Sequence, residues 1–212
     1  MKITKLGHSC LLVEMPAPTS RTALFDPGCY STVDVNSLQY LDDIIITHSH
    51  PDHFDLELVK QLVGKFPQVR ITAPAEIAEQ LAQERLAATS AASDGIELFN
   101  SPHEVIRPFF PHDPPQEIGV HYLGTLSHPG DSHSFTETKA VLALPVQAPW
   151  GSPNNAVKLA LDLKPQYIIP IHDWHWSEEG RASNYANMQA AFGAAGINFV
   201  HAVNGEPFVL DV

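Results

Sequence analysis

The sequence has little of what a secreted, membrane-spanning or disulfide-linked protein would need. Only two cysteines occur, Cys10 and Cys29, without a CxxC spacing, which predicts reduced and mostly buried thiols. No apolar run approaches the roughly 18 residues of a membrane-spanning helix. The first residues, MKITKLGHSCLLVEM, are too polar for a signal peptide and alternate like a strand. We therefore expect a soluble, cytoplasmic protein with no membrane partner.

Basic residues are also scarce, whereas histidine is abundant. The chain has 12 lysines and arginines against 24 acidic residues, a formal charge of −12. This balance disfavours the basic surface that neutralises nucleic-acid phosphates, so we expect a small-molecule substrate and no nucleic-acid partner. The 12 histidines equal lysine and arginine combined and gather with aspartates in loop-like segments. That bias indicates metal chemistry.

The order of periodic segments predicts a single α/β domain over residues 1–212. Short β-branched runs alternate with amphipathic segments, as in folds that layer helices on a sheet. A proline-rich segment, 105–118, excludes regular helix and is of a kind that often borders a site. The expected strands are 2–14, 22–26, 43–47, 69–74, 96–102, two strands within 119–132 that turn at Gly124, 140–146, 166–173 and 197–203, and the expected helices are 56–66, 75–87, 154–163 and 183–195.

The strongest functional signal is THSHPDH, at Thr47–His53, directly after a β-branched strand. Borderline-soft divalent ions prefer imidazole nitrogen with some carboxylate oxygen, and a tight turn lets neighbouring side chains diverge towards two ions. The motif therefore predicts two adjacent metal sites. The alternative, a polar loop that happens to contain three histidines, gives those side chains little structural purpose.

The pattern HxHxDH, formed here by His48, His50, Asp52 and His53, resembles the ligand motif of the metallo-β-lactamase superfamily without departure. The resemblance implies a four-layer αββα sandwich, in which two mixed sheets pack face to face and helices cover both outer sides. It also implies two divalent metal ions at one edge. Zinc is the first choice, with manganese or iron as alternatives.

Three further positions are similar to other motifs of that superfamily. Asp26, in LFDPG at the end of an early strand, is implied to orient the ligand loop without binding metal, and it also suits a turn before Pro-Gly. Asp131, in a Gly-Asp turn, is implied to bridge the two ions, because a carboxylate can give one oxygen to each. His172, after the apolar run YIIPI, is implied to be a ligand.

The remaining motif is an isolated histidine after a strand, and two residues compete for it. His103 follows its strand directly and is the better match, whereas His112 lies in the proline-rich segment. Carried over position by position, the resemblance assigns one ion to His48, His50 and His103, the other to Asp52, His53 and His172, and the bridge to Asp131.

Other histidines and the tryptophans carry weaker signals. His8, in LGHSC, either reaches the edge of the site or has a turn or packing role. His128 and His133 flank Asp131, but neither is expected to be a ligand. The tryptophans after the strand ends are residues of the kind found at subunit contacts, so a homo-oligomer is one of the expected states.

The resemblance implies a metal-dependent hydrolase. Two cations about 3.5–4 Å apart can share a water, lower its pKa and present it to a small ester, lactone or phosphoester. Asp52 is then expected to orient that water or to carry its proton. One alternative is a redox or sulfur-handling enzyme, although diiron flavoprotein relatives place Glu where this chain has His50. Another is a non-catalytic metal-binding module, but such modules usually lose ligands and none is lost here.

Overall fold

The computed structural model describes residues 1–212 and divides the chain into two compact units. The first comprises Met1–Ala92 with Val203–Val212, and the second comprises Ser93–Ala202. Each unit contains one mixed six-stranded sheet, two helices and a hydrophobic cluster of its own. That the units form one domain stays a prediction.

The sheet of the first unit has the strand order β12-β1-β2-β3-β4-β5. Its strands are β1 Lys2–Lys5, β2 Leu11–Glu14, β3 Thr22–Phe25, β4 Asp43–Ile45, β5 Arg70–Thr72 and β12 Pro207–Val209. The strands β3, β4 and β5 are parallel, and the other pairs are antiparallel. The carboxyl ends of β3 and β4 therefore meet at the same edge of the sheet, where ligands commonly bind in α/β proteins.

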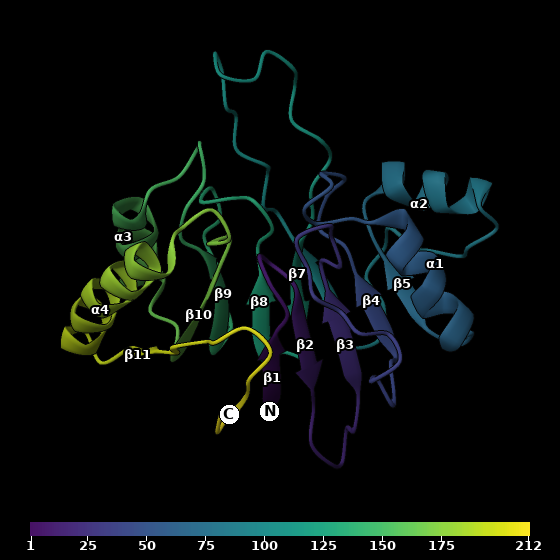
Figure 1. Cartoon of the computed structure of the whole chain (residues 1–212), viewed down its shortest axis with the longest axis horizontal. Helices are drawn as coiled ribbons and strands as arrows, with labels where there is room; N and C mark the ends of the chain where they lie inside the picture. Colours follow the sequence, from purple (N-terminus) through teal and green to yellow (C-terminus); the bar gives the residue numbers. More distant parts are fainter. The chain divides into compact units, whose positions relative to one another are not determined.

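Two helices, α1 Leu56–Lys65 and α2 Ala75–Gln83, belong to the first unit and lie beside β4 and β5 (Figure 1). Their apolar faces are buried in one cluster with Leu24 and Ile44 of the sheet. The Asp55 side chain caps α1 by accepting from the backbone of Glu57 and Leu58 at 2.9 and 3.1 Å. This cap fixes the point where the loop after β4 ends.

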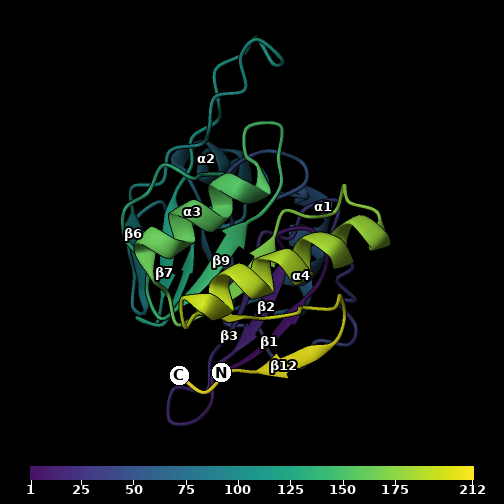
Figure 2. The ribbon, with the colours of Figure 1, turned by 90° about the vertical axis from the view of Figure 1, so that its left-hand side faces the viewer.

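The second unit has the strand order β11-β10-β9-β8-β7-β6. Its elements are β6 Ile96–Phe99, β7 Gly119–Tyr122, β8 Leu126–His128, β9 Val141–Pro145, α3 Pro153–Leu163, β10 Tyr167–Ile171, α4 Glu178–Ala194 and β11 Asn198–Phe199. The strands β8 to β11 are parallel, and β6 runs in the same direction as β8 because each is antiparallel to β7. Figure 2 shows α3 and α4 running side by side, and both contribute to the apolar cluster of this unit.

The expected single strand 2–14 is wrong, because the structure has two antiparallel strands there, β1 and β2. Gly7 causes the break. Its φ is +115°, and a Cβ at this position would lie 2.3 Å from the Tyr30 carbonyl oxygen, so only glycine fits. The chain reverses at this point, and His8 lies in the loop between the two strands.

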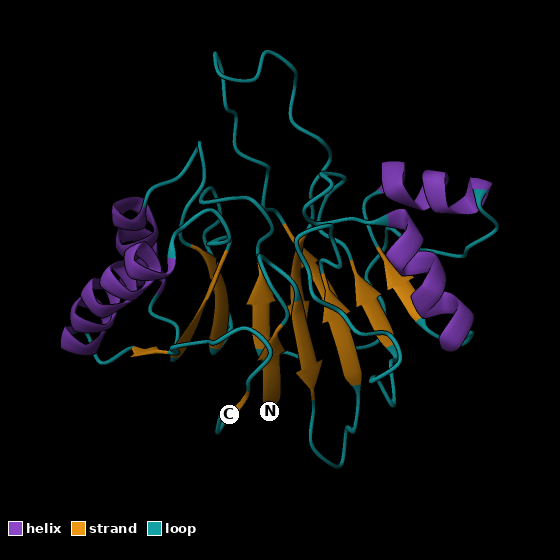
Figure 3. Ribbon diagram, in the orientation of Figure 1, coloured by secondary structure: helices purple, strands orange, loops and turns teal.

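The last helix also begins earlier than expected, at Glu178 instead of residue 183. Ser177 caps it by accepting from the backbone of Gly180 at 3.1 Å, and acidic residues in the first turn favour the helix N-terminus. None of the helices is both long enough and apolar enough to cross a membrane. The turn at Gly124 is confirmed, and the segment 105–118 contains neither helix nor strand (Figure 3).

The expectation for the cysteines is right for one residue and wrong for the other. Both are free, but Cys10 is buried and Cys29 is exposed. Burial raises the pKa of the Cys10 thiol well above its ordinary value. Cys29 differs because its side chain is exposed, although its backbone N–H donates to the Pro51 carbonyl at 2.7 Å.

His121 is a buried titratable group inside the second sheet, on β7. The Ser127 hydroxyl accepts from the backbone of Lys139 at 2.7 Å and is hydrogen-bonded to Nδ1 of His121 at 2.8 Å. Burial lowers the pKa of His121 from its ordinary value. The folded protein therefore takes up this proton at a lower pH than the unfolded chain, and the associated stability is lost as pH falls through the unfolded pKa.

We expect His121→Gln to flatten the acid side of the stability profile, since the glutamine amide can donate to or accept from Ser127 and does not titrate. Chemical denaturation from about pH 7 to about pH 5 should show the free energy of unfolding of the wild type decreasing more steeply than that of the variant. Parallel curves would contradict this reading of His121.

Candidate metal centre

The candidate ligands of the first unit lie where β3 and β4 end. Asp26 directly follows β3, and Thr47–His53 connects β4 to α1. Asp26 is fully buried, and its Oδ1 accepts from the Thr47 backbone at 2.8 Å while its Oδ2 accepts from the Thr47 hydroxyl at 2.9 Å. One carboxylate thus holds the start of the histidine loop.

The backbone of the histidine loop is packed directly against the turn after Asp26. A Cβ at Gly28 would lie 2.0 Å from the Asp52 carbonyl carbon, so any other residue would push the two segments apart. The Cys29 backbone N–H donates to Pro51 at 2.7 Å and the Asp55 N–H donates back to the Pro27 carbonyl at 3.0 Å. These contacts fix the loop between the strand end and the helix cap.

Asp26 also determines which nitrogen carries the proton in two of the histidines. Its Oδ2 lies 2.7 Å from His53 Nδ1, and because a carboxylate only accepts, Nδ1 is the donor, so that in the neutral ring the lone pair is on Nε2. The single Thr47 hydroxyl proton points to Asp26. That hydroxyl must therefore accept from His48 Nδ1, 3.1 Å away, which leaves the lone pair of His48 on Nε2 as well.

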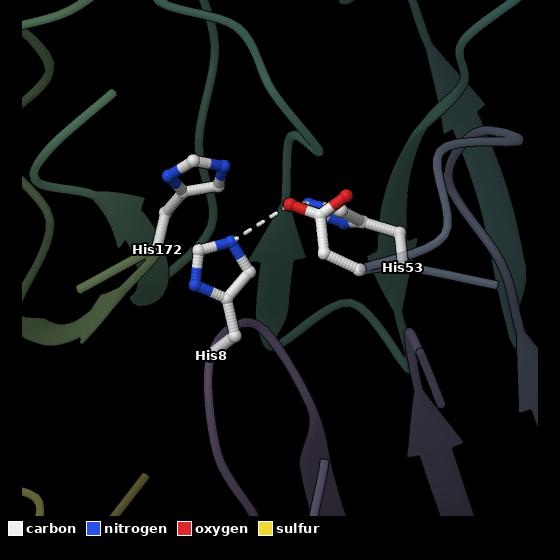
Figure 4. Close-up of side chains that lie close together, drawn as sticks. His8, His53 and His172 are labelled. Atoms are coloured by element: carbon white, nitrogen blue, oxygen red, sulfur yellow. Dashed lines mark ion pairs between the residues drawn. The ribbon is translucent and has the colours of Figure 1, made fainter. Parts of the chain in front are cut away.

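The ligand atoms of the first unit form two groups. His48 Nε2 lies 3.1 Å from His50 Nδ1. In the other group, Asp52 Oδ2 lies 3.2 Å from His8 Nε2 and 3.9 Å from His53 Nε2, and Figure 4 shows His8 and His53 with the His8–Asp52 ion pair as a dashed line. Two atoms that each bind one ion at about 2.1 Å are at most about 4.2 Å apart. Both groups satisfy this limit.

The second unit brings three candidate ligands together at one edge of its sheet. His103, Asp131 and His172 follow β6, β8 and β10, which run in the same direction. Asp131 Oδ2 lies 3.0 Å from His172 Nε2 and 3.8 Å from His103 Nε2. His103 Nδ1 donates to the Glu104 carbonyl at 2.8 Å and His172 Nδ1 donates to the Gln147 carbonyl. Both Nε2 atoms therefore keep their lone pairs, with the Asp131 carboxylate between them.

Two of these strand ends have a strained backbone. Asp26 has a φ of 44° and His172 a φ of 62°, in the left-handed region that most residues avoid. Each directly follows the last residue of a buried strand. Such conformations cost of order 1–3 kcal/mol and are typical of functional sites, where the surrounding contacts enforce them.

The turn that contains Asp131 is held from both ends of the proline-rich segment. Glu104 Oε1 accepts from the His133 backbone at 2.9 Å and from the Ser134 hydroxyl at 2.7 Å. Glu117 Oε2 accepts from the Asp131 backbone at 2.9 Å. The position of Asp131 therefore depends on residues at the two ends of the proline-rich segment.

These contacts bear on the choice between His103 and His112. His103 is buried next to Asp131, whereas His112 is exposed in the proline-rich segment 105–118. The geometry therefore favours His103. His8, which the sequence left between a site role and a packing role, is buried beside Asp52. The one signal that could have found it is Gly7, which breaks the first strand and turns the next residue inward.

Two groups near the candidate ligands have shifted pKa values. Burial lowers the pKa of His133, which remains neutral and donates from Nε2 to the Pro145 carbonyl at 2.8 Å. Desolvation, followed by the negative charge of Asp52, raises the pKa of the Cys29 thiol. The thiol of Cys29 therefore favours its protonated form at neutral pH. The candidate ligand atoms that lie close together are all imidazole nitrogens and carboxylate oxygens.

Comparison with known proteins shows the family. The model of the beta-lactamase superfamily domain matches residues 2–172. Protein Rv0786c of Mycobacterium tuberculosis is 30% identical over 201 residues, which cover 89% of this chain and 91% of that protein. A UPF0173 metal-dependent hydrolase of Aeropyrum pernix is 35% identical over 103 residues, 47% of this chain and 40% of that protein. The chain belongs to the β-lactamase superfamily.

Solved structures agree on the fold. Igni18, a metallo hydrolase from Ignicoccus hospitalis, has a TM-score of 0.69 at 19% identity, covering 99% of both chains. CmlA, a diiron β-hydroxylase from Streptomyces venezuelae, has a TM-score of 0.65 at 13% identity, covering 100% of this chain and 54% of that one. The predicted α/β metallo-β-lactamase fold, with two mixed sheets and flanking helices, is confirmed. Because the fold serves different reactions, it does not by itself select one.

We expect Asp26→Asn to weaken metal binding without unfolding the protein. An amide nitrogen in place of Oδ2 would face both the Thr47 hydroxyl and His53 Nδ1, which favours the other tautomer of His53 and removes the lone pair from Nε2. In place of Oδ1 it would face the Thr47 backbone N–H and weaken the hold on the loop. Loss of such a partner typically costs 10–100-fold in metal affinity, about the decrease we expect in a zinc competition assay. Unchanged affinity would show that Asp26 does not set the tautomer.

We also expect His103→Ala to lower the bound metal per chain, because this variant removes the imidazole beside Asp131. His112→Ala is the matched control, since it removes an exposed histidine of the adjoining loop and should leave the metal content unchanged. Elemental analysis of both proteins decides between them. The reverse result would transfer the ligand role to His112.

Proposed function

We propose that this chain is a metal-dependent hydrolase that holds two divalent ions and uses them to activate water against a small ester, lactone or phosphoester. The observation that carries the proposal is the state of four buried histidines. His48, His53, His103 and His172 each have Nδ1 engaged with an oxygen acceptor, which leaves Nε2 available to a metal. Metal-binding histidines characteristically have such a partner on the other ring nitrogen.

The proposed ligand sets follow the motif order. His48, His50 and His103 would hold one ion, Asp52, His53 and His172 the other, and Asp131 would bridge them. Within each unit, the distances support this division, since His48 is grouped with His50, Asp52 with His53, and Asp131 is close to both His103 and His172. Imidazole with carboxylate suits zinc first, with manganese or iron as alternatives.

The residues of the chain would divide the remaining work. Bound divalent ions acidify a water and polarise the bond to be cleaved, so no serine or cysteine nucleophile is required. The Asp52 carboxylate would orient the attacking water and take its proton. Asp26 would keep His48 and His53 in the binding tautomer, and Glu104 and Glu117 would hold the turn of Asp131.

Redox chemistry is the second candidate, and the likeness of the fold to the diiron β-hydroxylase CmlA is the observation that favours it. The two candidates differ in the metal. Iron with an absorption band in the purified protein would support oxidation, whereas zinc would support hydrolysis.

Metal analysis of protein purified without chelator tests the proposal, followed by ester, lactone and phosphodiester panels. We expect about two equivalents per chain in the wild type, and at least one lost in Asp131→Ala with hydrolysis reduced at least about 100-fold. Asp162→Ala, at an exposed position of α3, is the matched control and should behave as wild type. Wild-type protein that binds neither zinc, manganese nor iron would overturn the proposal.

A further inference from the structure

His8 lies outside the proposed ligand set, yet its side chain is held inside the first unit. It is 1% exposed, and its ring makes edge contacts with Tyr30 and His53, each at 5.6 Å between centroids. These contacts restrict the ring on two sides. A histidine packed this way cannot turn outward without opening the core around it.

The loop that presents His8 is rigid at both ends. The Leu6 N–H donates to the Cys10 carbonyl at 2.8 Å, and the Leu6 carbonyl accepts from the Thr32 N–H at 2.8 Å. Gly7 adopts the left-handed conformation that the Tyr30 carbonyl requires. The sequence GHSC therefore builds a fixed turn, with His8 at its inner side.

His8 has a polar contact with Asp52. Its Nε2 lies 3.2 Å from Asp52 Oδ2, whereas His53 Nε2 lies 3.9 Å from the same oxygen (Figure 4). A carboxylate only accepts, so a proton on His8 Nε2 makes the closer of these two contacts attractive.

Coordination number favours a supporting role for His8. The ion proposed at Asp52 already has His53, His172 and the bridging Asp131, and catalytic ions keep a position for water. A further imidazole would compete for that position. Carboxylate ligands, by contrast, are usually held by a hydrogen-bond donor that does not touch the metal.

We propose that His8 is a positioning residue whose Nε2 pairs with Asp52 Oδ2, 3.2 Å away, and holds this carboxylate towards the ion and the attacking water. The inference rests on the proposed metal site, and it assigns the first loop of the chain to that site. His8 acts through Asp52 and binds neither the metal nor the substrate.

Three substitutions separate this role from packing and from direct ligation. His8→Gln places an amide donor near the position of Nε2, His8→Asn places one near Nδ1, too far from Asp52, and His8→Leu fills the space without a donor. Zinc affinity is measured by competition with a chromophoric chelator, together with zinc equivalents, thermal unfolding, kcat and KM.

We expect His8→Gln to retain both zinc equivalents with affinity near that of the wild type. His8→Asn and His8→Leu should bind one of the ions about 10–100-fold more weakly and lose kcat more than KM. If His8→Gln loses one equivalent, as His53→Ala should, His8 is a ligand. If His8→Asn and His8→Leu bind zinc like the wild type, His8 has no positioning role. Wild-type protein that binds no zinc overturns the proposed function itself.

Discussion

The arrangement of the first unit depends on one buried carboxylate that can only accept hydrogen bonds. Asp26 accepts hydrogen bonds from the Thr47 backbone N–H, the Thr47 hydroxyl and His53 Nδ1. Its two oxygens therefore fix both the loop and the tautomers of His48 and His53. No other side chain offers two acceptors and no donor at this reach, apart from the longer glutamate. The strained backbone of Asp26 and the missing Cβ of Gly28 are needed for this arrangement, because both let the histidine loop approach the carboxylate.

In the second unit, backbone carbonyls fix the tautomers of the candidate ligand histidines. His103 and His172 each donate Nδ1–H to a carbonyl oxygen, of Glu104 and Gln147, and both direct Nε2 towards Asp131. A carbonyl, like a carboxylate, only accepts, so the tautomer is equally well determined. All four histidines thus have Nδ1 hydrogen-bonded to an oxygen acceptor, whether that oxygen belongs to a side chain or to the backbone. This shared state, more than the fold, supports metal chemistry, since the fold occurs in proteins with different reactions.

Prediction from the sequence succeeded where a local pattern was strong. The β-branched run before THSHPDH placed the motif at a strand end, and the amphipathic run after it gave a helix that begins at Leu56. It failed where one residue decided the local path. Gly7 divides the first strand and Ser177 starts the last helix early, and both effects depend on particular contacts, with the Tyr30 carbonyl and the Gly180 backbone.

The sequence by itself determined the family motif, the acidic and histidine-rich composition, the class of the fold and the residue types available to a metal. Those properties depend on residue identity and short spacing, which the chain carries in any conformation. Only the tertiary structure decided that His103 lies beside Asp131 while His112 is exposed, and that His8 faces Asp52. Such pairs are distant in sequence, and they meet only after strands align their carboxyl ends and a buried turn closes.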